Sequence, residues 1–116
     1  MKRKKLIKLI QDNLSDDLRK PKYKGHPNRL KGHCYVASEA FKHLSENPDD
    51  WKPGTLRHEG DIHWVLKHRI TGEIVDLTAG QFKTVPPYAT FRGRGFLTKL
   101  PSKRTQILIG RIKNEC

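Results

Sequence analysis

The stretch KGHCYVASEAF, residues 31–41, places a cysteine between a Gly-His pair and the first turn of an amphipathic helix. The helix is predicted over residues 34–44, and its apolar face consists of Val36, Ala37, Ala40, Phe41 and Leu44. Cys34 would then lie at the helix N-terminus, where free backbone N–H groups and the helix dipole stabilise a thiolate and lower the thiol pKa. The alternative interpretation is a structural thiol, because free cysteines are among the most buried residues in proteins.

The elements on either side of this helix define the predicted fold. An i, i+4 repeat of Leu and Ile predicts a first helix over residues 2–19, which ends before Pro21. After the central helix, strands are predicted near residues 55–58, 62–68, 73–78 and 105–113, with a loop over 80–95. Helices followed by strands indicate an α+β fold, in which the N-terminal helices pack on a small antiparallel sheet.

A thiol nucleophile needs a histidine base, and that histidine needs an orienting carboxylate or amide. His63 lies on the strand predicted over residues 62–68, and Asp76 lies on the next predicted strand. A four-residue loop between these strands would place His63 opposite Asp76, and a tighter loop at Ile70-Thr71 would place them diagonally but still within reach. A turn at Thr71-Gly72 would separate them, and the sequence leaves the register open.

The order of these motifs resembles a known enzyme family. A cysteine at a helix start, then His63-Trp64 on a strand, then the Gly72–Thr78 stretch GEIVDLT, is similar to the transglutaminase-like branch of the papain-like cysteine enzymes. The pattern from Gly32 to Arg104 is also similar to small phage and prophage proteins. The resemblance implies a papain/transglutaminase-like core and a Cys34–His63–Asp76 triad that acts on an amide or acyl bond. It also implies a protein or peptide-like substrate, with a host protein as the target of a phage factor.

Further residues are candidates for the oxyanion hole or for substrate contacts. The backbone N–H of Cys34 is one donor, and Asn28, six residues upstream, resembles in its spacing the glutamine amide of papain-like proteases. Asn28 is alternatively a turn residue after Pro27, and Gln81 is either a substrate-side amide or a loop residue. His33 and Trp64, the immediate neighbours of two triad residues, complete the set.

No cofactor or metal is expected. His58, His63 and His68 recur every five residues, so a strand would place them on alternating faces, and the chain has no CxxC pair. The two cysteines, Cys34 and Cys116, do not form a disulfide framework and favour a reducing compartment. Neither a membrane span nor a signal peptide is recognisable, so an unprocessed cytoplasmic protein without membrane association is expected, in the host cytoplasm if a phage encodes it.

The net charge of +12 lies at the two ends of a single predicted domain, residues 1–116. The helix and loop of residues 1–31 carry 11 Lys and Arg against 3 acids, and the segment 92–116 carries 7 against 1, whereas the core segment 32–91 carries 6 against 8. This asymmetry indicates an anionic partner, either nucleic acid or an acidic protein, unless the charge serves solubility alone. A cysteine-dependent hydrolase or acyltransferase is therefore predicted, and a non-catalytic basic binding protein is the alternative.

Overall fold

The computed structural model describes residues 2–115, which form three helices and a four-stranded sheet. The helices are α1 (Arg3–Asp12), α2 (Cys34–Leu44) and α3 (Lys103–Glu115). The strands are β1 (Trp51–His58), β2 (Asp61–His68), β3 (Ile74–Val75) and β4 (Arg92–Gly93). The fold is therefore α+β, as predicted.

The sheet has the order β3-β2-β1-β4, and every neighbouring pair is antiparallel. β1 and β2 form a long hairpin that pairs Trp51 with His68 at one end and His58 with Asp61 at the other. The two outer strands are much shorter, since β3 pairs with β2 only at two positions and β4 pairs with β1 only at Gly54 and Thr55. β1 begins at Trp51, four residues before the strand that the sequence predicted.

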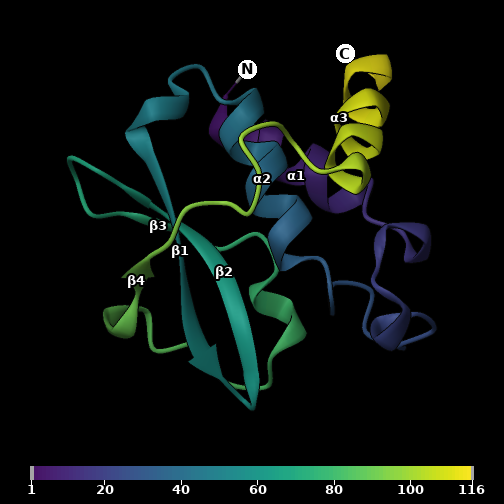
Figure 1. Ribbon diagram of the computed structural model, residues 1–116, viewed down its shortest axis with the longest axis horizontal. Coiled ribbons are helices and arrows are strands. Elements are labelled where there is room, and N and C mark those ends of the chain that lie inside the picture. The colour runs from purple at the N-terminus through teal and green to yellow at the C-terminus, as the bar shows by residue number, and fades with distance from the viewer. Residues whose placement is uncertain (1, 116) are drawn as a thin grey trace.

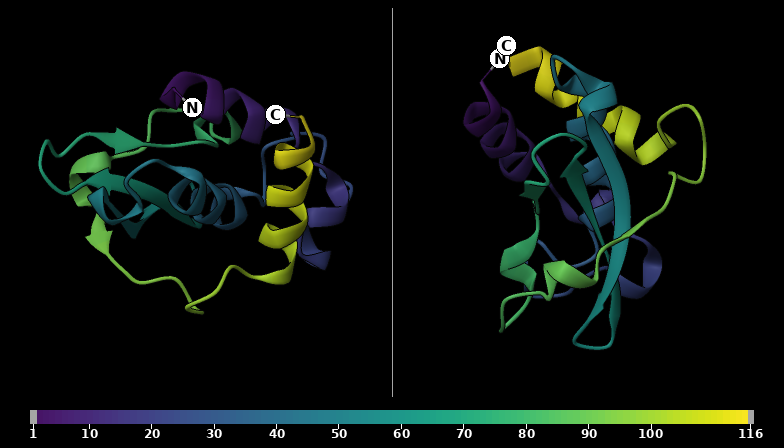
Figure 2. Two further views of the ribbon diagram at one scale, coloured as in Figure 1. Left: turned by 90° about the horizontal axis from the view of Figure 1, so that it is seen from above. Right: turned by 90° about the vertical axis from the view of Figure 1, so that its left-hand side faces the viewer.

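Helix α2 is the centre of the molecule and packs against β2, α1 and α3 (Figure 1). Its apolar face enters one core together with residues of the other helices and of the sheet. The fully buried side chains of this core include Ile10, Leu18, Val36, Phe41, Leu66, Leu77, Leu108 and Ile112. The two perpendicular views in Figure 2 show that α1 and α3 lie beside each other at the same end of the molecule. The predicted packing of the Cys34 helix on the sheet is confirmed.

The strand predicted over residues 105–113 is wrong, because this segment belongs to helix α3. Thr105, Leu108 and Ile112 are buried and recur at i, i+3 and i+7, which is helical spacing. Exposed Ile107 gave the segment its β-branched character without contributing to the buried stripe. Tertiary packing therefore decided the conformation of a segment whose local propensity is ambiguous.

The helix predicted over residues 2–19 ends early, at Asp12. The Asn13 side chain donates a hydrogen bond to the Leu9 carbonyl, a competing local interaction that is typical of a helix end. Leu14 and Leu18 nevertheless remain in the core, with Leu18 at the end of a short 3-10 helix, Asp16–Leu18. The apolar spacing therefore predicted burial correctly beyond the point where the helix stops.

The turn that leads into α2 requires a glycine at position 32. Gly32 has a φ of +85°, in the left-handed region, and a Cβ at this position would lie 2.7 Å from the Tyr23 side chain. Any other residue would be strained here and would push Tyr23 away. Gly32 thus fixes the direction from which the chain enters the helix at Cys34.

Candidate active site

His63 and Asp76 form a buried hydrogen-bonded pair. Nε2 of His63 lies 2.8 Å from Oδ2 of Asp76, and their side chains are 0% and 5% exposed. β3 pairs with β2 in the register that places Leu66 opposite Val75. This is the register expected for the tighter loop at Ile70-Thr71. Asp76 follows the last residue of β3, so it reaches His63 diagonally from the end of the strand rather than from a position directly opposite.

Cys34 is the first residue of α2 and lies beside the same imidazole. Burial lowers the pKa of His63, but the hydrogen bond that it donates to Asp76 and the interactions with the Cys34 thiol raise it more, to about 9. Nδ1 of His63 is buried, and no hydrogen bond of ordinary geometry joins it to any described residue. Since Asp76 occupies Nε2, Nδ1 is the ring nitrogen left for the thiol. Catalytic hydrogen bonds are often long before substrate binds, so this arrangement suits a Cys–His pair at rest.

A tyrosine that the sequence did not suggest completes the environment of Asp76. The hydroxyl of Tyr88 donates to Oδ2 of Asp76 at 2.8 Å, and the backbone N–H of Thr78 donates to Oδ1 at 3.1 Å. Burial and the neighbouring Asp76 carboxylate raise the pKa of Tyr88. Tyr88 lies in the segment predicted as loop, at the start of a 3-10 helix, Tyr88–Thr90. The sequence pattern PPY indicated irregular backbone and gave no signal for this contact.

The His63 ring is also fixed by packing. Phe82 contacts it edge to face, with ring centroids 4.7 Å apart and planes perpendicular. Together, Asp76 and Phe82 hold the imidazole in one orientation, because the first fixes a nitrogen and the second packs against the ring. A base that is held in this way keeps Nδ1 directed at its partner.

His33 and Asn28, two of the predicted substrate-binding residues, do not line the cleft at Cys34. His33 is fully buried at the N-cap of α2, and its two ring nitrogens lie 2.8 and 2.9 Å from the carbonyl oxygens of Ser15 and Arg29. Burial lowers the pKa of His33. Asn28 donates from its amide to the Gly80 carbonyl and accepts the backbone N–H of Leu30. Both side chains therefore hold the loop before α2 in place.

Gln81 and Trp64, in contrast, line the cleft together with Cys34. The cleft has a volume of about 440 Å³. Oε1 of Gln81 is buried and has no hydrogen-bond partner among the described residues. An unpaired buried carbonyl oxygen is costly, and a hydrogen-bond donor of a bound ligand would remove that cost. Trp64 forms part of the wall, stacked on Phe96 and edge to face with Tyr35.

Comparison with known proteins gives no relative for this chain: no family model, curated protein or solved structure matches it. Within residues 2–115, no group of three or more His, Cys, Asp or Glu side chains is arranged to hold a metal ion. In the same part of the chain, no helix combines the length and the apolar character needed to cross a membrane. The chemistry of the site is therefore inferred from its own geometry.

Proposed function

We propose that this protein is a cysteine-dependent hydrolase or acyltransferase that acts on an amide or acyl bond of a protein or peptide. The observation that carries the proposal is the buried His63–Asp76 pair at 2.8 Å beside Cys34, the first residue of an α-helix. Cys34 is the nucleophile, His63 the acid and base, and Asp76 the residue that orients the imidazole. These are the roles that the resemblance to transglutaminase-like enzymes implies for the three residues, and a papain/transglutaminase-like core is part of this proposal.

The raised pKa of His63 means that its imidazole is protonated at neutral pH, which favours a thiolate–imidazolium pair with Cys34. In the first step the thiolate attacks the carbonyl carbon, and the C=O electron pair moves to the oxygen. When the tetrahedral intermediate collapses, the bond to the leaving nitrogen breaks, and His63 gives its Nδ1 proton to that nitrogen. A thioester on Cys34 remains.

In the second step His63 takes a proton from water or from an amine as this nucleophile attacks the thioester. Cys34 then leaves as a thiolate, and the released product is an acid or a new amide. Asp76 stabilises the imidazolium in both steps, and its carboxylate keeps the hydrogen bond from Nε2 of His63. The developing oxyanion has two candidate donors, namely the backbone N–H of Cys34 in the unpaired first turn of α2 and the side-chain amide of Gln81.

An activated ester tests this function without knowledge of the natural substrate. Incubation with p-nitrophenyl acetate should give a burst of nitrophenolate close to one equivalent, with an acetyl group on Cys34 in the peptide map. The Cys34→Ser and His63→Ala variants should lose the burst, whereas His43→Ala, which alters an exposed histidine of the same α2 helix, should keep it. Acetylation at lysines only, with no burst, would contradict the proposal and favour the non-catalytic basic binding protein.

A further inference from the structure

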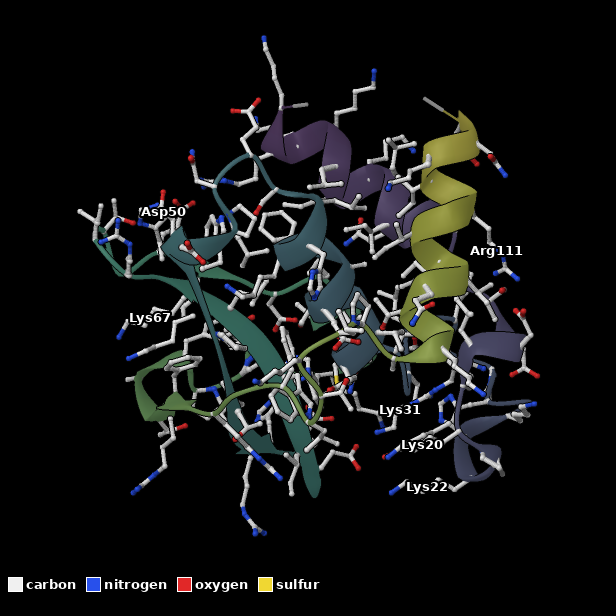
Figure 3. The ribbon with its side chains drawn as sticks, turned by 45° about the horizontal axis from the view of Figure 1, so that its top comes forward. Lys20, Lys22, Lys31, Asp50, Lys67 and Arg111 are labelled. Atoms are coloured by element: carbon white, nitrogen blue, oxygen red, sulfur yellow. The ribbon has the colours of Figure 1, made fainter. Side chains whose placement is uncertain are left out.

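The cleft at Cys34 is strongly cationic. Six basic side chains line it, from four separate parts of the chain: Lys20, Lys22, Lys31, Arg57, Arg94 and Arg104. Asp61 is the one carboxylate among the described lining residues, and it is already paired with Lys31. Figure 3 shows that the side chains of Lys20, Lys22 and Lys31, all from the segment before α2, end close to one another. The net charge of the site is therefore well above zero before any ligand binds.

Two of these cations are free to bind a ligand. Lys20 and Arg57 are exposed, and neither forms an ion pair or a side-chain hydrogen bond with a described residue. Arg94 instead lies over the Trp64 ring at 5.3 Å, and Arg104 donates to the Leu18 carbonyl at 2.9 Å. A cleft that fixes some of its cations and leaves others unpaired is electrostatically complementary to an anionic ligand.

The cleft is also elongated. A second hollow of about 440 Å³ shares Arg57, Ile62 and Arg94 with it and adds Arg92. Ile62 is half exposed at this junction. Beyond Thr55, β4 no longer pairs with the outer edge of β1. The two hollows therefore adjoin, and together, as the groove, they are suited to an extended chain, with an apolar contact at Ile62 and basic residues in both parts.

The aromatic residues of the groove favour a peptide over a nucleic acid. Single-stranded nucleic acids bind through bases that stack on open aromatic faces. Trp64 is only 8% exposed, and Phe96 stacks on it. Tyr35 packs edge to face with both of these rings, and its hydroxyl accepts the backbone N–H of Leu97 at 2.9 Å. Tyr23, the remaining aromatic side chain among the lining residues, is partly buried, and Lys22 Nζ lies over its ring at 4.7 Å. These rings are thus engaged with other side chains, and the groove offers charge without an open stacking platform.

We infer that the substrate of Cys34 is an acidic segment of a protein, with Asp or Glu residues flanking the acyl group that reacts. This inference rests on the proposed function, because a thiol nucleophile needs a carbonyl carbon and an acidic peptide is the polyanion that supplies one. The carboxylates contact Lys20 and Arg57, and the reacting residue lies at Cys34.

Two alkylating reagents of nearly equal size test the charge of the site. Iodoacetate is an anion and iodoacetamide is neutral. The rate of Cys34 with iodoacetate is divided by its rate with iodoacetamide, and this ratio is then divided by the same ratio for N-acetylcysteine. The normalised ratio reports the electrostatic potential at Cys34. We expect a normalised ratio of about 3 or more at low salt, falling as salt is added. The Lys20→Gln/Arg57→Gln variant should lower the ratio toward 1, and Asp61→Asn should raise it. The control Lys4→Gln/Lys5→Gln removes the same charge from exposed positions of α1 and should change nothing.

Protection and binding then identify the ligand class. An acidic peptide with glutamates around a central glutamine should slow iodoacetamide labelling of Cys34, and a peptide with serines in place of the glutamates should not. Direct titration of the Cys34→Ser variant with the fluorescent acidic peptide measures binding without any reaction. A normalised ratio near 1 in the unmodified protein, equal protection by both peptides, or protection by an oligothymidylate but not by the acidic peptide would overturn the inference. If the acidic peptide binds the Cys34→Ser variant but Cys34 is unreactive, the proposed function is wrong, and the inference that the cleft binds an acidic peptide is still supported.

Discussion

Tyr88 and His63 bind the same oxygen atom, since each lies 2.8 Å from Oδ2 of Asp76. Asp76 therefore has two partners at one oxygen, and Thr78 N–H occupies the other. A carboxylate that accepts hydrogen bonds from three donors is held in one position. The histidine that depends on it is oriented by a network rather than by a single contact.

Replacing Tyr88 by Phe should weaken this network without creating a large cavity. The variant loses a hydrogen bond to a charged group, so we expect its free energy of unfolding to fall by about 1–2 kcal/mol. The rate of Cys34 acylation by p-nitrophenyl acetate should also fall, because Asp76 becomes free to turn away from His63. Urea unfolding and the ester burst measure the two effects.

The matched control is Tyr23→Phe, since the Tyr23 hydroxyl forms no hydrogen bond with a described residue. This variant should match the unmodified protein in urea unfolding, the measurement for which it is the control, since Tyr23 itself lines the Cys34 cleft. If Tyr88→Phe matched the unmodified protein in both measurements, the contact with Asp76 would have no role in either stability or reactivity.

The pKa of His63 gives a pH dependence of defined sign. The folded-state pKa of about 9 lies above the unfolded value near 6.5, so folding favours the imidazolium. The resulting stabilisation is fully present below pH 6.5 and is lost as the pH rises through 9, by an amount on the order of 1–3 kcal/mol. The difference in unfolding free energy between the unmodified protein and Asp76→Asn should therefore shrink over this range. NMR titration of the imidazole should follow the same interval, and a His63 that titrates near 6.5 would contradict the ion pair.

Gln81 and Asn28 should differ in their effects, although both are amides near the site. Gln81→Ala removes a side chain that lines the Cys34 cleft, so acylation by the ester should slow by roughly tenfold or more if this amide binds the oxyanion. Asn28→Ala removes two contacts that hold the loop before α2, so it should lower the melting temperature more than the acylation rate. The reverse pattern would return the oxyanion role to Asn28.

Helix α3 should depend on one buried acid of α2. Glu39 is fully buried, and its Oε1 accepts hydrogen bonds from the Thr105 hydroxyl at 2.7 Å and from the Ser102 backbone N–H at 3.0 Å. Glu39→Ala leaves the Ser102 N–H unpaired and leaves the Thr105 hydroxyl with Ser102 Oγ as its remaining partner, which should destabilise the protein by about 1–3 kcal/mol in urea unfolding. Glu115→Ala, at an exposed position of the same helix, should be nearly neutral. Equal unfolding midpoints for the two variants would show that Glu39 does not hold α3.

The sequence predicted the central helix, the β2 strand and the α+β class, because in each case the hydrophobic period was clear. It failed at residues 105–113, where isoleucines suggest a strand and only the packing against α2 decides for a helix. β4 could not be foreseen either, since two residues carry no periodic signal. It forms where Phe91 and Arg92 approach Gly54 so closely that a Cβ there would lie 2.3 Å from the Phe91 ring.

The candidate site was also predicted from the sequence only in part. Motif order predicts a site of Cys34, His63 and Asp76, and in the structure His63 contacts both of the other two residues. His33 looked like a site residue because it adjoins Cys34, but its ring turns inward to two backbone carbonyls. Tyr88 was missed because its role depends on a loop that folds back over Asp76, twelve residues away along the chain. Adjacency in sequence was thus a poorer guide than the expected chemistry of a triad.

In the proposed mechanism Cys34 reacts as a thiolate paired with the His63 imidazolium, and its alkylation rate at pH 6 tests this pairing most directly. At that pH only about 0.3% of an ordinary thiol with a pKa near 8.5 is ionised. Cys34 should therefore react with iodoacetamide at least about tenfold faster than N-acetylcysteine and than Cys116, which lies outside the described residues. The His63→Ala variant should remove this advantage. Equally slow labelling of both cysteines below pH 7, unchanged by His63→Ala, would mean that Cys34 is a structural thiol and that the proposed cysteine-dependent function is wrong.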